Sequence, residues 1–373
     1  MTTTTPTVGG SPAHTTVPLL LVDDLRTGIH TDRGTVKAVD GVSLSLRRGR
    51  TLGVVGESGS GKTMLAKSIM GLLPRGKVDR SGSVRLDGDE LLTRSPKQMR
   101  KVWGTELSMV PQDPMTSLNP VRRVGDQITE PLRHHLSLDR REARETALAL
   151  LSSVRIPDPE KRLREYPHQL SGGMRQRVVI AAALACGPRL LFADEPTTAL
   201  DVTVQAQILN VLGRMQEERH MAMVLVTHDL GVVAGHTDEI IVMYAGQVVE
   251  RAPTTVLFEE MRMPYTQALL ASIPTLEDPV HTRLAVIPGR PPDLVSPPQG
   301  CRFAPRCEYA QDKCRKEAPP LMADTPGHEY RCWFPVDGPK VRSATAVADP
   351  TVSGNGTGGS AHAGGAGGTG EVS

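Results

Sequence analysis

Aromatic side chains are scarce in this sequence of 373 residues, where Phe, Trp and Tyr together make up 3%. A buried core must therefore be mainly aliphatic. No apolar run approaches the ~20 residues that a membrane-spanning helix requires. The Thr-rich stretch of residues 1–18 lacks a basic cluster followed by an apolar segment, which excludes a secretory signal. We therefore expect a chain that stays in the cytoplasm and reaches a membrane only through a partner protein.

An excess of charge of one sign is also missing. The sequence has 43 Lys and Arg against 41 Asp and Glu, which gives a formal net charge of +2. So balanced a composition predicts neither nucleic-acid binding nor an acidic substrate. We expect no nucleic-acid partner.

Cysteine is infrequent, but four of the five cysteines fall close together near the C-terminus: Cys301, Cys307, Cys314 and Cys332. In a reducing compartment such a cluster predicts a metal or iron–sulfur site before disulfides. Structural zinc sites favour short C-x2–4-C spacings, which are absent here. Iron–sulfur clusters tolerate wider spacing, so a [4Fe–4S] cluster is the favoured interpretation. Zinc, free cysteines and disulfides remain the alternatives.

Short apolar runs alternate with helical patterns along most of the chain. The expected strands are residues 19–22, 42–46, 52–56, 190–193 and 222–226. The expected helices are residues 63–73, 141–154, 177–186 and 205–218. Strands that alternate with helices predict an α/β fold with a mostly parallel sheet covered on both faces.

Composition divides the chain into four parts. Residues 1–17 form a polar tail and residues 343–373 a tail of Gly, Ala, Ser and Thr, both predicted to be disordered. Residues 18–262 carry the α/β pattern. Residues 263–342 form a Pro-rich C-terminal region that contains the four cysteines, with a predicted linker at 288–298.

A glycine-rich segment after the third expected strand matches the phosphate-binding pattern G-x-x-x-x-G-K-[ST]. Its residues, with the one that follows, are Gly56, Glu57, Ser58, Gly59, Ser60, Gly61, Lys62, Thr63 and Met64. Backbone N–H groups and the start of the next helix would face the phosphates of ATP. Lys62 would neutralise the β- and γ-phosphates, and Thr63 would bind Mg²⁺. An ordinary glycine turn would not need the strand before it and the helix after it.

Two carboxylates end the fourth expected strand. Asp194 is placed to hold Mg²⁺, and Glu195 can polarise the attacking water as a general base. The alternative is a pair of solvated acids before Pro196. Beside a phosphate loop, the catalytic interpretation is favoured.

A third motif, residues 170–177 (LSGGMRQR), places Ser171, Gly172 and Gly173 before an Ala-rich helix. A hydroxyl, bare backbone N–H groups and a helix start can together face an anion, although a serine cap with two glycines is common. The segment resembles the signature of ATP-binding-cassette proteins. The resemblance implies that it contacts the γ-phosphate bound by the opposite subunit, so that two cassettes enclose two nucleotides.

Three further residues match landmarks of that family. Gln112 resembles the glutamine that senses Mg²⁺ and contacts the membrane partner. Asp201 resembles the residue that communicates across the dimer, and His228 the histidine that contacts the γ-phosphate. The aromatic that usually stacks on adenine is missing between Leu25 and Val39, which leaves Ile29 or His30 as candidates. The resemblance implies an α/β P-loop ATPase cassette with a mostly parallel sheet, an antiparallel subdomain and a helical subdomain.

Longer matches resemble one branch, the ATPases of oligopeptide and dipeptide importers, which also serve nickel uptake. They comprise residues 55–62, 111–120, 166–173, 193–205, 227–234, 264–270 and 301–307. Met263 and Ala304 stand where this branch usually has His. Some of its members have similar cysteines and carry a [4Fe–4S] cluster.

The resemblance implies peptide import driven by ATP hydrolysis, from the cytoplasmic face of the membrane. The implied partners are two membrane-spanning permease subunits, a second, non-identical cassette and an extracytoplasmic substrate-binding protein. Import of nickel or an opine is the alternative within the branch. A soluble cassette ATPase is disfavoured because the stretch between Gln112 and Ser171 is short and lacks heptads, and because one cassette is present. A redox-sensing module built on the cysteines is the third alternative.

Overall fold

The computed structural model describes residues 17–74, 76–198, 201–273 and 286–338. Both expected tails lie outside these residues, apart from Val17. Among the described residues, no helix is both long and apolar enough to cross a membrane.

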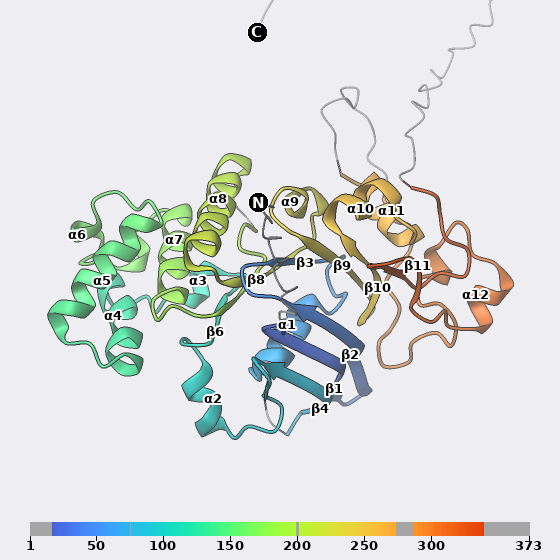
Figure 1. The fold of residues 1–373 in the computed structure, drawn as a ribbon, viewed down its shortest axis with the longest axis horizontal. Coiled ribbons are helices and arrows are strands. Elements are labelled where there is room, and N and C mark those ends of the chain that lie inside the picture. The colour runs from blue at the N-terminus through green and yellow to red at the C-terminus, as the bar shows by residue number, and fades with distance from the viewer. Residues whose placement is uncertain (1–16, 75, 199–200, 274–285, 339–373) are drawn as a thin grey trace, which may run out of the picture. The chain divides into compact units, whose positions relative to one another are not determined.

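The larger of two sheets has eight strands in the order β11-β12-β10-β9-β3-β8-β7-β6 (Figure 1). The strands from β9 to β6 are parallel, whereas β10, β11 and β12 pair antiparallel at the other edge. In chain order the bounds are β3 (Thr51–Val55), β6 (Leu107–Val110), β7 (Leu190–Asp194), β8 (Ala222–Thr227), β9 (Glu239–Tyr244), β10 (Gln247–Pro253), β11 (Met322–Thr325) and β12 (His328–Tyr330). The prediction of a mostly parallel sheet is confirmed.

A smaller antiparallel sheet has the order β2-β1-β4-β5. Its strands are β1 (Leu20–Thr31), β2 (Gly34–Leu46), β4 (Val78–Leu86) and β5 (Asp89–Glu90). The expected strand at 19–22 was too short because the pairing of β1 with β2 shifts register between Val22 and Leu25. This bulge, where Asp24 has a φ of 42°, breaks the apolar pattern while the strand continues.

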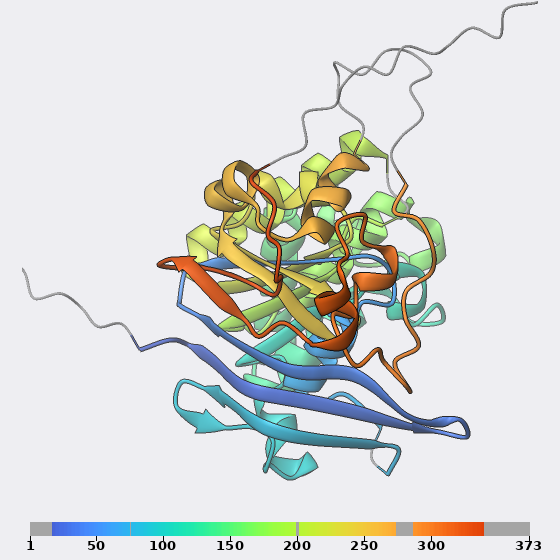
Figure 2. The same cartoon turned by 90° about the vertical axis from the view of Figure 1, so that its right-hand side faces the viewer.

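Helices cover the large sheet on both faces (Figures 1 and 2). In chain order, the helices of the described residues are α1 (Lys62–Met70), α2 (Pro96–Val102), α3 (Pro114–Ser117), α4 (Val124–His135), α5 (Arg140–Ser153), α6 (Pro159–Arg162), α7 (Gly172–Ala183), α8 (Val202–Arg219), α9 (Leu230–Ala234), α10 (Thr254–Glu260), α11 (Pro264–Ala271) and α12 (Asp312–Lys316). Two 3₁₀ turns, Pro167–Gln169 and Ala304–Arg306, complete the elements.

Capping residues explain where the predicted helix bounds were wrong. The helices expected at 177–186 and 205–218 begin earlier, because Ser171 and Asp201 accept hydrogen bonds from backbone N–H groups of the first turn. The helix expected at 63–73 ends at Met70, because Gly71 adopts a φ of 68° and turns the chain.

Two apolar cores hold these layers together. Leu65 and Ile69 of α1 share one core with Leu20 of β1 and Val54 of β3, so α1 lies between the small and large sheets. The second core joins α4, α5, α7 and α8 to the other face of the large sheet and continues to Phe303 in the C-terminal region. Most of its members are aliphatic, as the composition requires.

The C-terminal region contacts the cassette at several places. Strand β12 pairs with β10, where Glu250 lies opposite Tyr330. The segment predicted as a linker has no regular structure, but the Leu294 carbonyl accepts a hydrogen bond from the Lys37 N–H at 3.0 Å. Arg33 and Asp293 form an ion pair at 2.5 Å. The segment therefore packs along the β1–β2 hairpin.

Candidate functional site

The phosphate loop connects the buried strand β3 to α1, as the motif requires. Gly61 has a φ of 105°, and a Cβ at this position would lie 2.5 Å from the Ala38 carbonyl oxygen, so only glycine fits. The Ser60 hydroxyl is buried and has no hydrogen-bond partner among the described residues. An unpartnered buried donor beside a helix start suits an incoming anion.

Lys62 places a cation inside this loop. Its side chain is 4% exposed, and Nζ donates to the carbonyls of Gly56 at 2.7 Å and Glu57 at 3.0 Å. Burial lowers the pKa of Lys62, and the Glu195 carboxylate at 3.8 Å acts in the opposite direction. Phosphate oxygens would offer this ammonium a stronger, charged partner.

Asp194 is the last residue of β7. Its side chain faces Thr63, the residue that follows Lys62. The Thr63 hydroxyl donates to Asp194 Oδ1 at 3.0 Å. Burial raises the pKa of Asp194, and the Thr63 hydrogen bond partly offsets this rise. A hydroxyl and a carboxylate side by side are oxygen ligands of the kind that Mg²⁺ prefers.

Glu195 follows Asp194 in the left-handed region, with a φ of 46°. Such a backbone is strained for a non-glycine residue and is typical of functional sites. Its Oε2 accepts hydrogen bonds from Gln112 and Thr198, both at 2.9 Å. The Nδ1 atom of His228, from the loop after β8, lies 3.4 Å from the same oxygen. The structure thus brings Gln112, His228 and Lys62 together around one carboxylate.

The signature residues form a separate group. Ser171 caps α7 by accepting from the Met174 N–H at 3.3 Å, and Asp201 caps α8 by accepting from the Val204 N–H at 2.9 Å. A Cβ on Gly173 would lie 3.1 Å from the Val204 side chain, whereas one on Gly172 would meet nothing within 4 Å. Within the described part of the chain, no hydrogen bond or ion pair joins this group to the phosphate loop, and Figure 1 shows α7 apart from α1.

Three residues at the site were missed by the sequence analysis. Thr198 contacts Glu195, as described above. Arg306 donates to the Glu57 carboxylate at 2.6 and 2.9 Å, and the Tyr265 hydroxyl accepts from the Glu57 N–H at 2.8 Å. Arg306 lies in the segment 301–307, whose pattern carried no sign of a contact with the phosphate loop.

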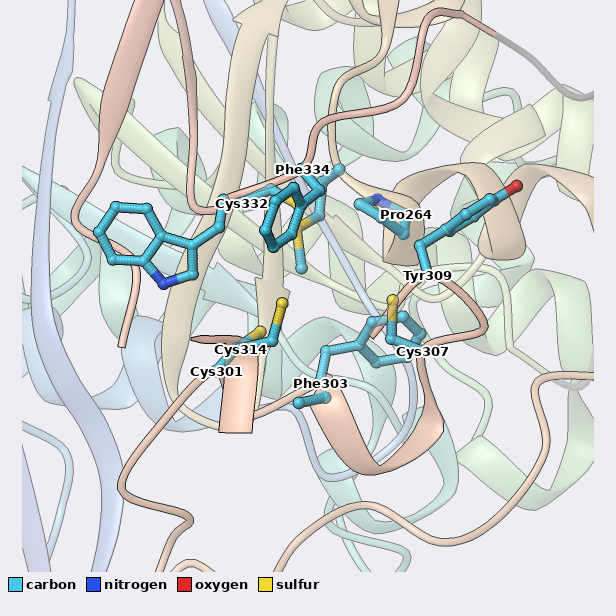
Figure 3. Close-up of a pocket in the computed structure, with 11 residues that line it drawn as sticks. Pro264, Cys301, Phe303, Cys307, Tyr309, Cys314, Cys332 and Phe334 are labelled. Atoms are coloured by element: carbon cyan, nitrogen blue, oxygen red, sulfur yellow. The ribbon is translucent and has the colours of Figure 1, made fainter. Parts of the chain in front are cut away.

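The four cysteines line one pocket with aromatic walls (Figure 3). The other lining residues are Met263, Pro264, Phe303, Ala304, Tyr309, Trp333 and Phe334. Burial raises the pKa of Cys301, that of Cys307 to about 11 and that of Cys332 to about 12. No group of three or more His, Cys, Asp or Glu in the described residues is arranged to hold a metal ion. Burial therefore favours the protonated thiol at Cys301, Cys307 and Cys332.

Two family models match the chain. The model of the ABC transporter covers residues 39–198, and that of the oligopeptide/dipeptide transporter C-terminal region covers residues 249–314. The oligopeptide transport ATP-binding protein OppD of Bacillus subtilis is 48% identical over 332 residues, which is 88% of this chain and 92% of that protein. OppD of Salmonella typhimurium is 47% identical over 320 residues, 86% of this chain and 94% of that protein.

Solved structures agree with this comparison. One is the ATP-binding cassette MJ0796 in a dimeric post-hydrolysis state bound to ADP and Pi, which is 26% identical with a TM-score of 0.57. The match covers 63% of this chain and 98% of that chain. The protein cbiO1 from Clostridium perfringens is 27% identical with a TM-score of 0.54 and covers 65% of this chain and 90% of its own. The family resemblance found in the motifs is confirmed: this chain belongs to the ABC transporter ATPases, in the branch of the oligopeptide and dipeptide transport ATP-binding proteins.

Proposed function

We propose that this chain hydrolyses ATP to power the import of oligopeptides or dipeptides through a membrane-spanning partner. The arrangement around Glu195 carries the catalytic part of the proposal, because Gln112, His228 and Lys62 meet this carboxylate beside the phosphate loop. The printed function of the OppD relatives supports the peptide part.

In the proposed mechanism, the loop amides and the α1 start bind the phosphates, and Lys62 leaves its carbonyl partners for the β- and γ-oxygens. Glu195 takes a proton from the attacking water, while the bonds from Gln112 and Thr198 hold its carboxylate in place. His228, with a side chain 58% exposed, is free to contact the γ-phosphate. Mg²⁺ held by Thr63 and Asp194 would neutralise charge on the phosphates.

The site is completed by a second cassette in this proposal. Ser171, Gly172, Gly173 and Asp201 lie at two helix starts that do not contact the phosphate loop of their own chain, so they are available to a nucleotide bound by a partner. The dimeric state of the similar cassette MJ0796 supports this assembly. We infer a non-identical partner cassette from the family branch.

The remaining partners are two permease subunits and an extracytoplasmic substrate-binding protein that delivers the peptide. In the segment that follows Gln112, Met115 and Val121 are 60% and 79% exposed. Contiguous exposed apolar surface is typical of protein interfaces. We propose that this surface contacts the permeases and that the chain works on the cytoplasmic face of the membrane.

Uptake by the assembled transporter tests the function. With the permeases and partner cassette in liposomes, uptake of a labelled oligopeptide should require ATP and stop in the Glu195→Gln variant. Unlabelled oligopeptides and dipeptides should compete, whereas nickel and opines should not. If nickel or an opine competes and peptides do not, the proposed peptide cargo is wrong. The assignment as an ATPase would remain intact.

We also propose that the cysteine pocket holds a [4Fe–4S] cluster through Cys301, Cys307, Cys314 and Cys332. A zinc ion with bonds of about 2.3 Å would need four sulfurs about 3.8 Å apart. The cysteines line one pocket and lack the short spacings of a structural zinc site, which favours a polynuclear centre. A cluster there would supply the positive charge that keeps these buried thiols deprotonated.

The cluster prediction is checked on chain purified without oxygen. We expect broad visible absorption together with equal amounts of iron and acid-labile sulfide. Cys314→Ser should lose most of both, whereas Cys186→Ser, which alters the one cysteine outside the pocket, should keep them. Zinc without sulfide in the parent protein would contradict the proposal.

A further inference from the structure

Glu57 of the phosphate loop is held by the C-terminal region at its side chain. Arg306 makes a bidentate pair with its carboxylate, at 2.6 and 2.9 Å. The Arg306 side chain is 3% exposed and also donates to the carbonyls of Ile287 and Pro288 and to the Tyr244 hydroxyl. A guanidinium held by this many acceptors has one orientation, so it fixes the position of the carboxylate.

Glu57 is held at its backbone as well. Its N–H donates to the Tyr265 hydroxyl at 2.8 Å, and its carbonyl accepts from Lys62 Nζ at 3.0 Å. The Tyr265 ring packs against Tyr244 and Phe303, with ring centroids 4.6 and 5.2 Å apart. Arg306 and Tyr265, which lie outside the cassette, therefore contact Glu57 directly. Glu57 in turn contacts Lys62, the cation that we propose to bind the phosphates.

The same residues connect this restraint to the cysteine pocket. Arg306 directly precedes Cys307, in the 3₁₀ turn Ala304–Arg306. Phe303 lines the pocket (Figure 3), and its ring also packs on Tyr265. Met263 and Pro264, which lead into Tyr265, line the pocket too. We therefore expect that a change in the conformation of the residues lining the pocket displaces Arg306 and Tyr265, the two residues that hold Glu57.

We propose that the C-terminal region positions the phosphate loop for ATP through Arg306 and Tyr265, so that the integrity of the cysteine pocket sets the affinity for nucleotide. The inference rests on the proposed ATPase function and adds regulation of the same site. Neither residue contacts the reacting atoms, so both are positioning residues. Losing Arg306 leaves a half-buried carboxylate without its partner, which shifts the loop away from the geometry that binds phosphate.

The test measures binding of a fluorescent ATP analogue and the steady-state kinetics of the full chain assembled with its partners. Arg306→Met should raise the dissociation constant about tenfold, or ~1.4 kcal/mol, and raise KM for ATP, while kcat at saturating ATP stays within about twofold. Arg306→Lys should restore part of the affinity, because an ammonium keeps the charge but not the planar fork. Tyr265→Phe should raise the dissociation constant about threefold.

The matched control is Arg262→Met. Arg262 is the residue directly before the C-terminal region and pairs with Asp324 and Asp337 of that region at 3.3 and 2.5 Å. It should bind the analogue like the parent. If Arg262→Met and Arg306→Met weaken binding of the analogue equally, the effect is a general loss of structure and the proposal is overturned.

Two double variants trace the path of the effect. In a Glu57→Gln background, Arg306→Met should add no more than about twofold, because its partner carboxylate is gone. Cys314→Ser should weaken binding about threefold in the parent but not further in the Arg306→Met chain. Additive effects in either pair would refute the route. If Lys62→Ala abolishes binding while Arg306→Met does not change it, only this inference fails and the ATPase function stands.

Discussion

ATP hydrolysis is expected to fall at least about a hundredfold when Glu195 is replaced by Gln. The amide keeps the size of the side chain and can still meet Gln112 and Thr198, but it cannot accept a proton from water. ATP should bind as in the parent, because Glu195 holds no phosphate. Release of phosphate in single-turnover and steady-state assays, together with equilibrium ATP binding, measures the two effects separately.

Glu106→Gln is the matched control for this variant. Glu106 is a carboxylate just before β6 that pairs with Arg189 at 2.8 Å, at the opposite end of the strands that carry Gln112 and Glu195. Its replacement should leave the rate of hydrolysis unchanged. Hydrolysis by Glu195→Gln within tenfold of the parent rate would show that another group activates the water.

Lys62→Ala is expected to weaken ATP binding by about thirtyfold or more, since losing a buried charged partner costs about 2 kcal/mol or more. The Lys62 side chain is 4% exposed, and the loop encloses its ammonium group. Replacing it by Ala leaves the phosphate oxygens of ATP without a charged partner. Burial lowers the pKa of Lys62, which means that desolvation of the charged ammonium destabilises the fold when no nucleotide is bound. The variant should therefore unfold at the same temperature as the parent or higher.

Isothermal titration with Mg·ATP and thermal unfolding without nucleotide check both parts. Lys101→Ala, which removes an exposed lysine from α2, should leave both unchanged. A Lys62→Ala chain that binds and turns over Mg·ATP like the parent would remove the basis of the proposed mechanism. A chain that loses binding only because it unfolds would be recognised by its lower melting temperature.

Local patterns were sufficient for the parts of the fold that short-range physics controls. The buried strand, the glycines that must take positive φ at positions such as Gly61, and the helix after them are determined by neighbouring residues. Apolar periodicity alone placed the starts of α7 and α8 too late; the cap Ser171 was recognised from its motif, whereas Asp201 was not recognised as a cap. Strand β1 was too short because a bulge interrupts its alternation but not its pairing.

Contacts between distant segments depended on the sheet topology. Gln112 and Glu195 are 83 residues apart but meet at 2.9 Å, because β6 and β7 are parallel neighbours and both deliver their next residues to the same edge. Family motifs suggested that such residues cooperate, but not that Thr198 and His228 share the same carboxylate oxygen with Gln112.

By itself, the sequence determined the nucleotide loop, the paired acids, the signature helix start and the family, because each depends on a few adjacent residues. Only the tertiary structure decided that Arg306 holds Glu57, 249 residues away, and that aromatic residues such as Phe303 and Trp333 line the pocket of the four cysteines. The physical reason is that these contacts arise from the packing of an irregular segment against the large sheet. No local periodicity or spacing encodes the partner that such a segment will meet.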